Sequence, residues 1–289
     1  MSGQDADIAQ ILARRHDNGA DYWATPDGRI SKGSPFTTLD CALMLKDLGM
    51  DPTDPVLKGT ADLVFRTLRD DGRFAIAPHG AIYPCHTINA VRALCHLGYA
   101  EDPRLRGTFD HLARIEEADG GWRCRKFSYG RGPETDCSNP GPTLAALDAL
   151  RFVPLCHQPE ALDAAVDFLL DHWVVRAPIG PCHFGIGSLF LQVAYPFSSY
   201  NLFFYVYVLS FHERARRDPR FLEALSLLES TLDDGRVVVQ RPHQKLRSLA
   251  FCRRGEVSDL ATGHYLEIRR NLEEGPRLDG PAPPAGRRP

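Results

Sequence analysis

Residues 119–151 read DGGWRCRKFSYGRGPETDCSNPGPTLAALDALR and contain the parts from which the fold can be inferred. The turn Asp119-Gly120-Gly121 ends the preceding segment, because paired glycines supply the backbone freedom of a tight reversal. After a polar loop, the cluster at residues 138–142 begins a helix, since Ser or Asn caps free N–H groups and proline is tolerated in the first turn. From residue 144 to 150 this helix is apolar on nearly every face, Asp148 excepted. We therefore expect it to be buried on more than one side.

The same pattern recurs along the chain as an internal repeat. Four segments open with an acid or amide, then proline, then apolar residues at helical spacing, which indicates a one-sided, amphipathic helix. These segments start at Asp54-Pro55, Asp102-Pro103, Gln158-Pro159 and Asp218-Pro219. An earlier helix is indicated by Ile8, Ile11 and Leu12. Asp-Gly turns follow four of these five helices, at Asp27, Asp71, Asp119 and Asp234.

A second helix in each unit is expected to be apolar over much of its circumference. The expected ranges are residues 37–48, 86–97, 142–152, 200–211 and, with a more polar composition, 258–272. Outer one-sided helices that alternate with inner apolar helices, at a period of about fifty residues, predict two concentric layers. The fold class is therefore all-α, an α/α toroid of about five helix pairs whose closure can be incomplete. An open α-solenoid is the alternative, because periodicity alone does not show whether the ring closes.

Composition indicates an ordinary globular chain. The 289 residues carry 43% hydrophobic and 25% charged residues and a net charge of -3, so there is no global bias toward nucleic acid. We expect one domain over residues 1–274 and a disordered tail over 275–289, which is rich in Pro and Gly. The acidic N-terminus lacks the features of a signal peptide, so a cytoplasmic location is expected. The eight cysteines there would be thiols or metal ligands.

Three short segments resemble the prenyltransferase and squalene oxidase repeat: residues 83–87 (YPCHT), residues 93–99 (ALCHLGY) and residues 119–122 (DGGW). That repeat builds the α/α toroid of protein prenyltransferase β subunits and of terpenoid cyclases. The resemblance implies isoprenoid chemistry and, through His86-Thr87 with Asp136-Cys137, a zinc ion that activates a thiol beside a prenyl diphosphate. No Asp-x-Asp-Asp motif of the class II cyclases is present.

Cysteine and histidine also suggest a metal without that resemblance, because thiolates and imidazole are ligands that zinc prefers. Loops of adjacent units in a ring come close in space. We therefore expect zinc to be bound by Cys124 and Cys137 with Cys85 or His86. The alternative is that these cysteines are buried bystanders, as free cysteines often are. His96, His111 and His172 are expected near helix surfaces.

Residues 184–211 contain ten aromatic residues and no charged residue. The run is long enough for a membrane span, but glycine, proline and small polar residues interrupt its middle, so no transmembrane segment is expected. Peripheral contact with a membrane stays open. Core packing is the ordinary explanation of the aromatic side chains. The functional one is a cavity wall for an apolar chain, formed by Tyr200, Phe203, Phe204 and Tyr207.

Basic residues gather in two segments, the loop after Trp122 and residues 236–255. Such runs are usually solvated, but together they would suit a diphosphate. The candidate anion-binding residues are Arg123, Arg125, Lys126, Arg131, Arg241 and Lys245. RNA is a weaker candidate, because aromatic and basic residues are not interleaved.

These observations predict an isoprenoid-related enzyme, similar to a prenyltransferase or terpene cyclase, with an aromatic central cavity and a zinc or thiol site at its mouth. Asp136 and Glu134 are the candidate proton-transferring residues. The expected ligand is an apolar small molecule or a prenyl diphosphate. The alternative is a non-catalytic toroid that binds an apolar ligand or a protein partner and keeps metal only for loop order.

Overall fold

The structure is a computed structural model that describes residues 3–130, 132–153 and 160–275. Over these residues it contains helices and isolated β-bridges and no strand, so the all-α prediction is confirmed. The α-helices are α1 (Gly3–Ala13), α2 (Thr38–Asp47), α3 (Pro55–Phe65), α4 (Pro84–His96), α5 (Arg106–Arg114), α6 (Pro140–Leu150), α7 (Asp163–Val175), α8 (Leu202–Leu209), α9 (Glu213–Arg216), α10 (Pro219–Glu229) and α11 (Asp259–Glu274). Short 3₁₀ helices are η1 (Pro103–Leu105), η2 (Pro133–Thr135), η4 (Gln244–Leu246) and η5 (Ala250–Cys252).

Helix starts follow the repeat read from the sequence. Asp54, Asp102 and Asp218 each accept a hydrogen bond from the backbone N–H two residues on, at 2.7, 2.9 and 2.9 Å. Each is followed by a proline in the first turn, where the missing N–H costs nothing. The acid-proline pattern therefore begins α3, η1 and α10 by satisfying N–H groups that the helix leaves unpaired.

Two of the Asp-Gly turns, at Gly72 and Gly120, lie against the next unit. Gly72 has φ +84° and Gly120 has φ +83°, a conformation that favours glycine. A Cβ atom at Gly72 would lie 2.1 Å from the carbonyl oxygen of Gly107, and one at Gly120 would lie 2.3 Å from the carbonyl carbon of Ala164. These glycines are needed both for the turn and for the close approach of the neighbouring backbone.

Tryptophan and threonine join the turn to the two helices of its unit. The indole N–H of Trp122 donates to the carbonyl oxygen of Leu112 at 3.0 Å, near the end of α5. Three residues that stand two positions after a turn glycine donate their backbone N–H to a threonine hydroxyl of the following inner helix. The pairs are Phe74 with Thr87 at 3.1 Å, Trp122 with Thr143 at 3.1 Å and Val237 with Thr262 at 3.0 Å. The repeat is thus visible in hydrogen bonds as well as in helix spacing.

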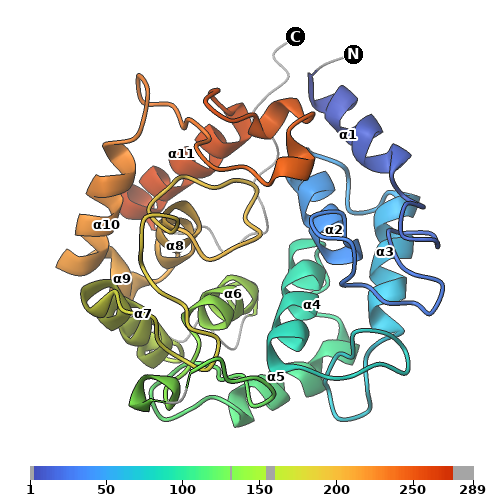
Figure 1. Ribbon diagram of the computed structural model, residues 1–289, viewed down its shortest axis with the longest axis horizontal. Coiled ribbons are helices and arrows are strands. Elements are labelled where there is room, and N and C mark those ends of the chain that lie inside the picture. The colour runs from blue at the N-terminus through green and yellow to red at the C-terminus, as the bar shows by residue number, and fades with distance from the viewer. Residues whose placement is uncertain (1–2, 131, 154–159, 276–289) are drawn as a thin grey trace.

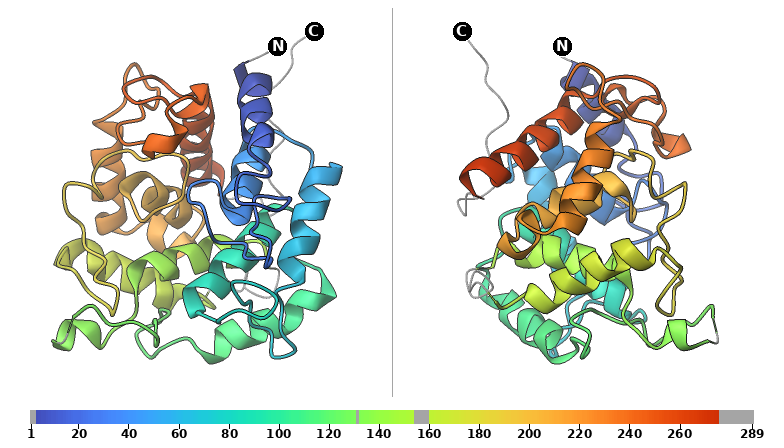
Figure 2. Two further views of the ribbon diagram at one scale, coloured as in Figure 1. Left: turned by 45° about the vertical axis from the view of Figure 1, so that its right-hand side comes forward. Right: turned by 90° about the vertical axis from the view of Figure 1, so that its left-hand side faces the viewer.

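In Figure 1 the helices α2, α4, α6, α8 and α11 lie around the centre of the molecule, and α3, α5, α7 and α10 lie farther out. Neighbouring central helices contact one another from α2 through α4, α6 and α8 to α11. The circuit continues through η5 to α1, which also contacts α2 (Figures 1 and 2). A double-layered toroid stays a prediction, because these contacts identify neighbours and do not establish two complete layers.

One hydrophobic cluster extends from Ile11 to Ile268, the packing expected of a single domain. Within the described residues, no helix has the length and apolar composition needed to cross a membrane. The expected disordered tail lies outside the described residues beyond Gly275.

Candidate functional site

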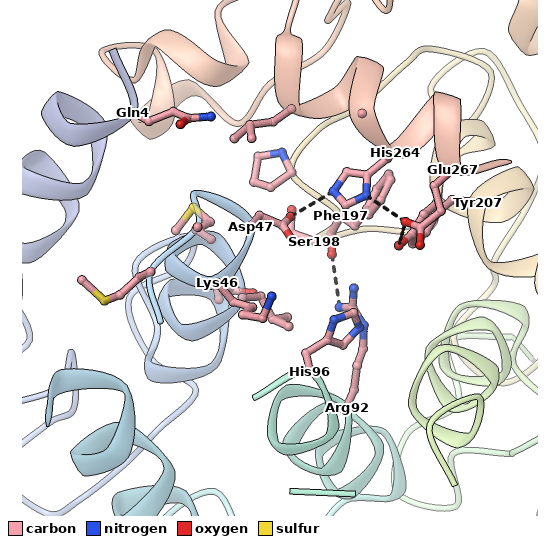
Figure 3. Close-up of a pocket in the computed structure, with 18 of the residues that line it drawn as sticks. Gln4, Lys46, Asp47, Arg92, His96, Phe197, Ser198, Tyr207, His264 and Glu267 are labelled. Carbon is pink, nitrogen blue, oxygen red and sulfur yellow. Dashed lines mark hydrogen bonds and ion pairs between the residues drawn. The ribbon is translucent and has the colours of Figure 1, made fainter. Parts of the chain in front are cut away.

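A cavity of about 960 Å³ lies among the central helices (Figure 3). Its apolar lining includes Leu43, Met44, Phe197, Leu260 and Leu266. Its polar lining combines acids, bases and a phenol. These residues are Asp40, Lys46 and Asp47 of α2, Arg92 and His96 of α4, Arg151 at the end of α6, Tyr207 of α8, and His264, Glu267 and Arg270 of α11. Polar side chains from five helices therefore line one cavity, together with apolar side chains.

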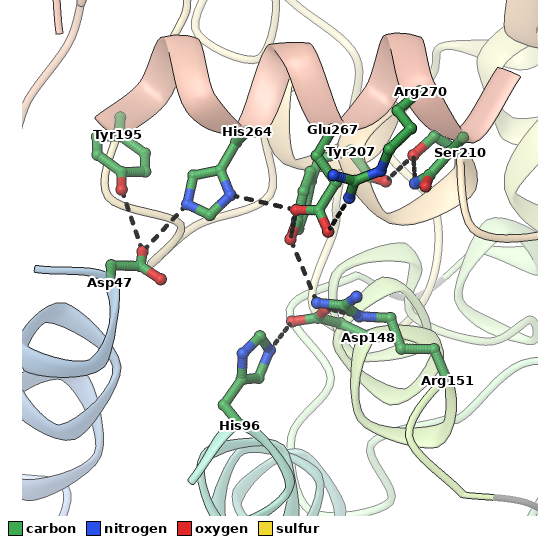
Figure 4. A network of polar contacts seen from close by, with 11 residues as sticks. Asp47, His96, Asp148, Arg151, Tyr195, Tyr207, Ser210, His264, Glu267 and Arg270 are labelled. Carbon is green, nitrogen blue, oxygen red and sulfur yellow. Dashed lines mark hydrogen bonds and ion pairs between the residues drawn. The ribbon is translucent and has the colours of Figure 1, made fainter. Parts of the chain in front are cut away.

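His264 lies between two carboxylates, Asp47 of α2 and Glu267 of its own helix α11 (Figures 3 and 4). Its Nε2 lies 3.4 Å from Asp47 Oδ2, and its Nδ1 lies 3.9 Å from Glu267 Oε2. Burial alone would lower the pKa of His264, but the two carboxylates raise it to about 9. His264 is therefore an imidazolium at neutral pH.

Two tyrosines extend this chain of contacts. The hydroxyl of Tyr195 donates to Asp47 Oδ2 at 3.1 Å, and that of Tyr207 donates to Glu267 Oε2 at 2.9 Å. Burial raises the pKa of Asp47 and of Glu267, yet contacts with His264 outweigh burial and leave both pKa values below their usual range. Both carboxylates are thus held in the ionised form.

A second cluster centres on Asp148, which has no exposed side-chain area. Its carboxylate accepts hydrogen bonds from Arg92 Nε at 2.6 Å and Arg151 Nε at 2.9 Å, and lies 2.8 Å from His96 Nε2 (Figure 4). Burial raises the pKa of Asp148, but the three basic side chains lower it well below its usual range. Burial lowers the pKa of His96 against the effect of Asp148. His96, which the sequence placed on or near a helix surface, is the last residue of α4, and its side chain is 13% exposed, lines the cavity and contacts Asp148.

The two arginines of this cluster also cover aromatic faces. The Arg92 guanidinium lies 4.6 Å from the centroid of Phe204, and the Arg151 guanidinium lies 3.8 Å from that of Phe211. Arg151 NH2 also reaches the Tyr207 hydroxyl at 3.3 Å, which links the Asp148 cluster to Glu267. Each guanidinium thus already occupies one face of its ring in a cation–π contact.

Asp40 and Lys46, both on α2, are less constrained. Asp40 Oδ2 accepts from the Thr37 hydroxyl at 2.8 Å, and burial raises its pKa although Thr37 and Arg92 oppose the shift. Burial lowers the pKa of Lys46, while Asp47 acts in the opposite direction. No hydrogen bond or ion pair joins the Lys46 ammonium to another described residue. These two side chains are therefore the ones best placed to meet a ligand.

Equivalent repeat positions supply much of this site. Arg92, Asp148 and Glu267 each stand five residues after the threonine that fixes their unit, Thr87, Thr143 and Thr262. One charged residue in each of α4, α6 and α11, at a constant offset from that threonine, was the sequence signal for Arg92, Asp148 and Glu267.

Of the four aromatic residues expected to line a cavity, Tyr207 does so. Phe203 and Phe204 are buried and pack against Phe197, with ring centroids 4.9 and 5.1 Å apart. The hydroxyl of Tyr200 lies 2.9 Å from His172 Nδ1. Phe197, which the sequence reasoning did not select, is the aromatic residue that faces the cavity together with Tyr207 (Figure 3).

The two basic segments do not form one described site. Arg123 pairs with Asp136 at 3.0 Å, Arg125 pairs with Glu117 at 2.6 Å, and Lys126 is exposed. Lys245 donates to the carbonyl oxygen of Ser34 at 3.2 Å, and the backbone N–H of Arg241 donates to the carbonyl oxygen of Val193 at 3.1 Å. Arg131 lies outside the described residues.

The two candidate proton-transferring acids lie in the loop after Trp122. The side chain of Asp136 is 78% exposed, and Glu134 lies 3.9 Å from His183 Nε2. Neither is among the residues that line the central cavity. A joint role with His264 or Tyr207 would therefore require movement of this loop.

The candidate zinc ligands are only partly brought together. His86 Nε2 lies 3.0 Å from the carbonyl oxygen of Ala75, and burial lowers its pKa to about 4. Cys137 Sγ donates to the carbonyl oxygen of Glu134 at 3.2 Å. Burial, followed by Cys124, raises the pKa of Cys85. In the described part of the chain, no three His, Cys, Asp or Glu side chains already stand as a metal-ligand set.

No family model matches this sequence, and no curated protein matches it. Among solved structures, the chain is similar to a protein from Actinoplanes. The identity is 17%, the match covers 92% of this chain and 82% of the other, and the TM-score is 0.44. This likeness carries no argument about function.

Proposed function

We propose that the protein is an enzyme that binds a molecule with an apolar chain, an isoprenoid or a related compound, in the central cavity and transfers a proton during its conversion. The observation that carries the proposal is the convergence of acids, bases and a phenol from five helices on one cavity with apolar walls. A volume of about 960 Å³ lies within the range of small-molecule sites.

Asp40 is the proposed proton-transferring residue. Its pKa is displaced upward by burial, toward the neutral range in which a carboxyl group exchanges protons efficiently. Asp47 and Glu267, in contrast, have lowered pKa values and are engaged by His264 and tyrosine hydroxyls. They position the imidazolium and hold it as a fixed positive charge.

The Lys46 ammonium is the proposed contact for an anionic head group. It faces the cavity from α2 (Figure 3). Arg270 lines the cavity from α11, where its NH2 donates to Glu267 Oε1 at 3.2 Å and its buried Nε has no partner in the described structure. Cations on two opposing walls suit a phosphate or carboxylate at one end of an apolar ligand. No step of this proposal uses zinc.

The test is a panel of prenyl diphosphates and unphosphorylated isoprenoids, with binding followed by thermal shift and turnover by mass spectrometry and diphosphate release. We expect Asp40→Asn to bind the active ligand and to lose turnover roughly 10²–10⁴-fold. The matched control is Asp136→Asn, an exposed carboxylate outside the cavity, which should retain turnover.

The other outcomes are equally informative. Turnover lost in Asp136→Asn but kept in Asp40→Asn would move the chemistry to the loop after Trp122. Binding without turnover of any compound would support the non-catalytic alternative. Absence of both binding and turnover would overturn the proposal.

A further inference from the structure

A surface cleft separate from the central cavity lies between the residue that follows α1 and the segment that contains η4. Its volume is about 480 Å³, and Arg14, Gln244, Lys245, Arg247 and Ser248 line it. None of these residues lines the central cavity. In the same loop as η4, η5 contacts α1 (Figure 1). The cleft is therefore formed where the first and the last units of the described chain meet.

Positive charge is concentrated in this cleft. Arg14, Lys245 and Arg247 are three of its lining residues, and no described Asp or Glu lines it. Arg14 Nη1 lies 3.3 Å from Asp17 Oδ2, but these side chains are 45% and 53% exposed, and such exposed pairs contribute little. No hydrogen bond or ion pair joins the Arg247 guanidinium to another described residue. Carboxylates of the described chain therefore do not offset the mutual repulsion of the three cations inside the cleft.

Contacts with the rest of the protein hold two of these cations in place. The Arg14 guanidinium lies 4.7 Å from the ring centroid of Phe36, which is a buried residue. Lys245 Nζ donates to the carbonyl oxygen of Ser34 at 3.2 Å. Leu246, which follows Lys245 in η4, has no exposed area and anchors this short helix to the core. A ligand would therefore meet charges that are already positioned, and would lose less affinity to side-chain ordering.

Three permanently charged nitrogen donors suit a phosphate group. A phosphate monoester carries a charge of about −1.5 to −2 at neutral pH and has three strong acceptor oxygens. Arginine binds such oxygens in pairs through its planar fork, and lysine adds a compact charge. The described lining contains no aromatic side chain on which a base could stack, which is evidence against a single-stranded nucleic acid.

We propose that this cleft binds a phosphate group, carried by a free small molecule or by a lipid head group, and that the bound phosphate joins the end of α1 to η4. Arg14 donates to the phosphate from the first unit, and Lys245 and Arg247 donate from the last. Because all three contacts exist only when the two segments are packed together, the ligand stabilises that packing by mass action. The site is separate from Lys46 and Arg270, the proposed contacts of a head group in the central cavity.

Isothermal titration calorimetry of the full-length protein with inorganic phosphate and pyrophosphate, at constant ionic strength, tests the site. We expect a saturable binding event that Lys46→Gln leaves in place. Arg247→Gln and Arg14→Gln should each weaken it about 10-fold, since each removes charged donors to the phosphate. Arg253→Gln is the matched control, because Arg253 lies in the same loop, pairs with Glu256 at 3.8 Å and does not line the cleft.

Hydrogen exchange tests the proposed link between the two segments. Phosphate should slow exchange at the end of α1 and in η4 together, in the wild type and in Arg253→Gln but not in Arg247→Gln. Sedimentation with phosphatidylcholine vesicles that contain phosphatidic acid distinguishes the two sources of phosphate. Co-sedimentation that Arg247→Gln abolishes would identify a lipid, and binding of the soluble anions alone would identify a free molecule.

Circular dichroism establishes that each variant is folded. The absence of saturable binding to either anion or to the vesicles would overturn the proposal. Equal weakening in Arg253→Gln and Arg247→Gln would overturn it too, because it would indicate a diffuse attraction. Binding that is lost in Lys46→Gln but kept in Arg247→Gln would place the anion in the central cavity, and binding without slower exchange would refute the link between α1 and η4. Turnover in the central cavity enters none of these measurements.

Discussion

At the scale of the single residue, His264 predicts a pH dependence of stability. Its pKa is about 9 in the folded protein, against an ordinary value of 6.5. A group whose pKa is raised by folding stabilises the protein below its unfolded pKa, and that contribution is lost as pH rises through the folded pKa. The free energy of unfolding should therefore fall between about pH 6.5 and 9, by an amount on the order of 3 kcal/mol.

Urea unfolding across this pH range measures the effect. His264→Gln should be less stable than the wild type near pH 6 and should lose most of the decline. His16→Gln, at a position where the side chain is 72% exposed, should keep the wild-type profile. An equal decline in His264→Gln and wild type would show that the imidazolium is not the group responsible.

Residue types alone did not reveal why His86-Thr87 occurs where it does. Thr87 accepts the backbone N–H of Phe74, the same bond that Thr143 and Thr262 make with their own turns. The threonine of this pair therefore has a structural role that recurs in three units, and a sequence comparison with zinc enzymes does not separate that role from metal binding.

At the scale of the element, Asp148 joins α6 to α4 through a buried charge cluster. Removing its charge would leave Arg92, His96 and Arg151 without their carboxylate. Breaking a buried pair in this way is strongly destabilising, because charges remain buried and uncompensated. We expect Asp148→Asn to lower the free energy of unfolding by about 3–5 kcal/mol.

Chemical denaturation of this variant is compared with that of Asp167→Asn. Asp167 pairs with Arg214 at 2.9 Å, but both side chains are at least 36% exposed, so a loss below about 1 kcal/mol is expected. If the two variants lose similar stability, the Asp148 cluster does not hold α4 and α6 together.

The helices were the predictable part of the structure, since caps, prolines and apolar spacing act locally. The starts of α2, α4 and α6 lie within two residues of those expected. The cavity was less predictable, because its charged side chains pair with partners on other helices. Asp148 was recognised only as an exception on an apolar helix, and Arg92 and Glu267 gave no local signal of their partnership with it.

At the scale of the whole molecule, Asp7 connects the two ends of the described chain. It is buried, and its two carboxylate oxygens accept the backbone N–H groups of Ala250 and Phe251 at 2.8 and 2.9 Å. Helix α1 contacts η5 and also α2. Asp54 and Asp218 accept a backbone N–H at the start of their own helices. Asp7 makes the same kind of bond, but to a segment that is distant in the sequence.

We expect Asp7→Ala to destabilise the protein by about 1–3 kcal/mol, because two buried N–H groups lose their acceptor. Hydrogen exchange should show faster exchange in α1 and η5 together. Gln10→Ala, an exposed change on the same helix, should leave exchange unaltered. Faster exchange in α1 alone would mean that η5 is held by other contacts.

The contribution of α11 to the cavity also constrains the order of events during synthesis. Asp47 leaves the ribosome early in translation, whereas His264, which neutralises it, follows more than two hundred residues later. Until then the Asp47 carboxylate must stay hydrated, because an unpaired charge is costly to bury. The nascent chain can therefore form its early helices one by one. We expect water to remain around Asp47, in the space between the central helices, until α11 has been synthesised.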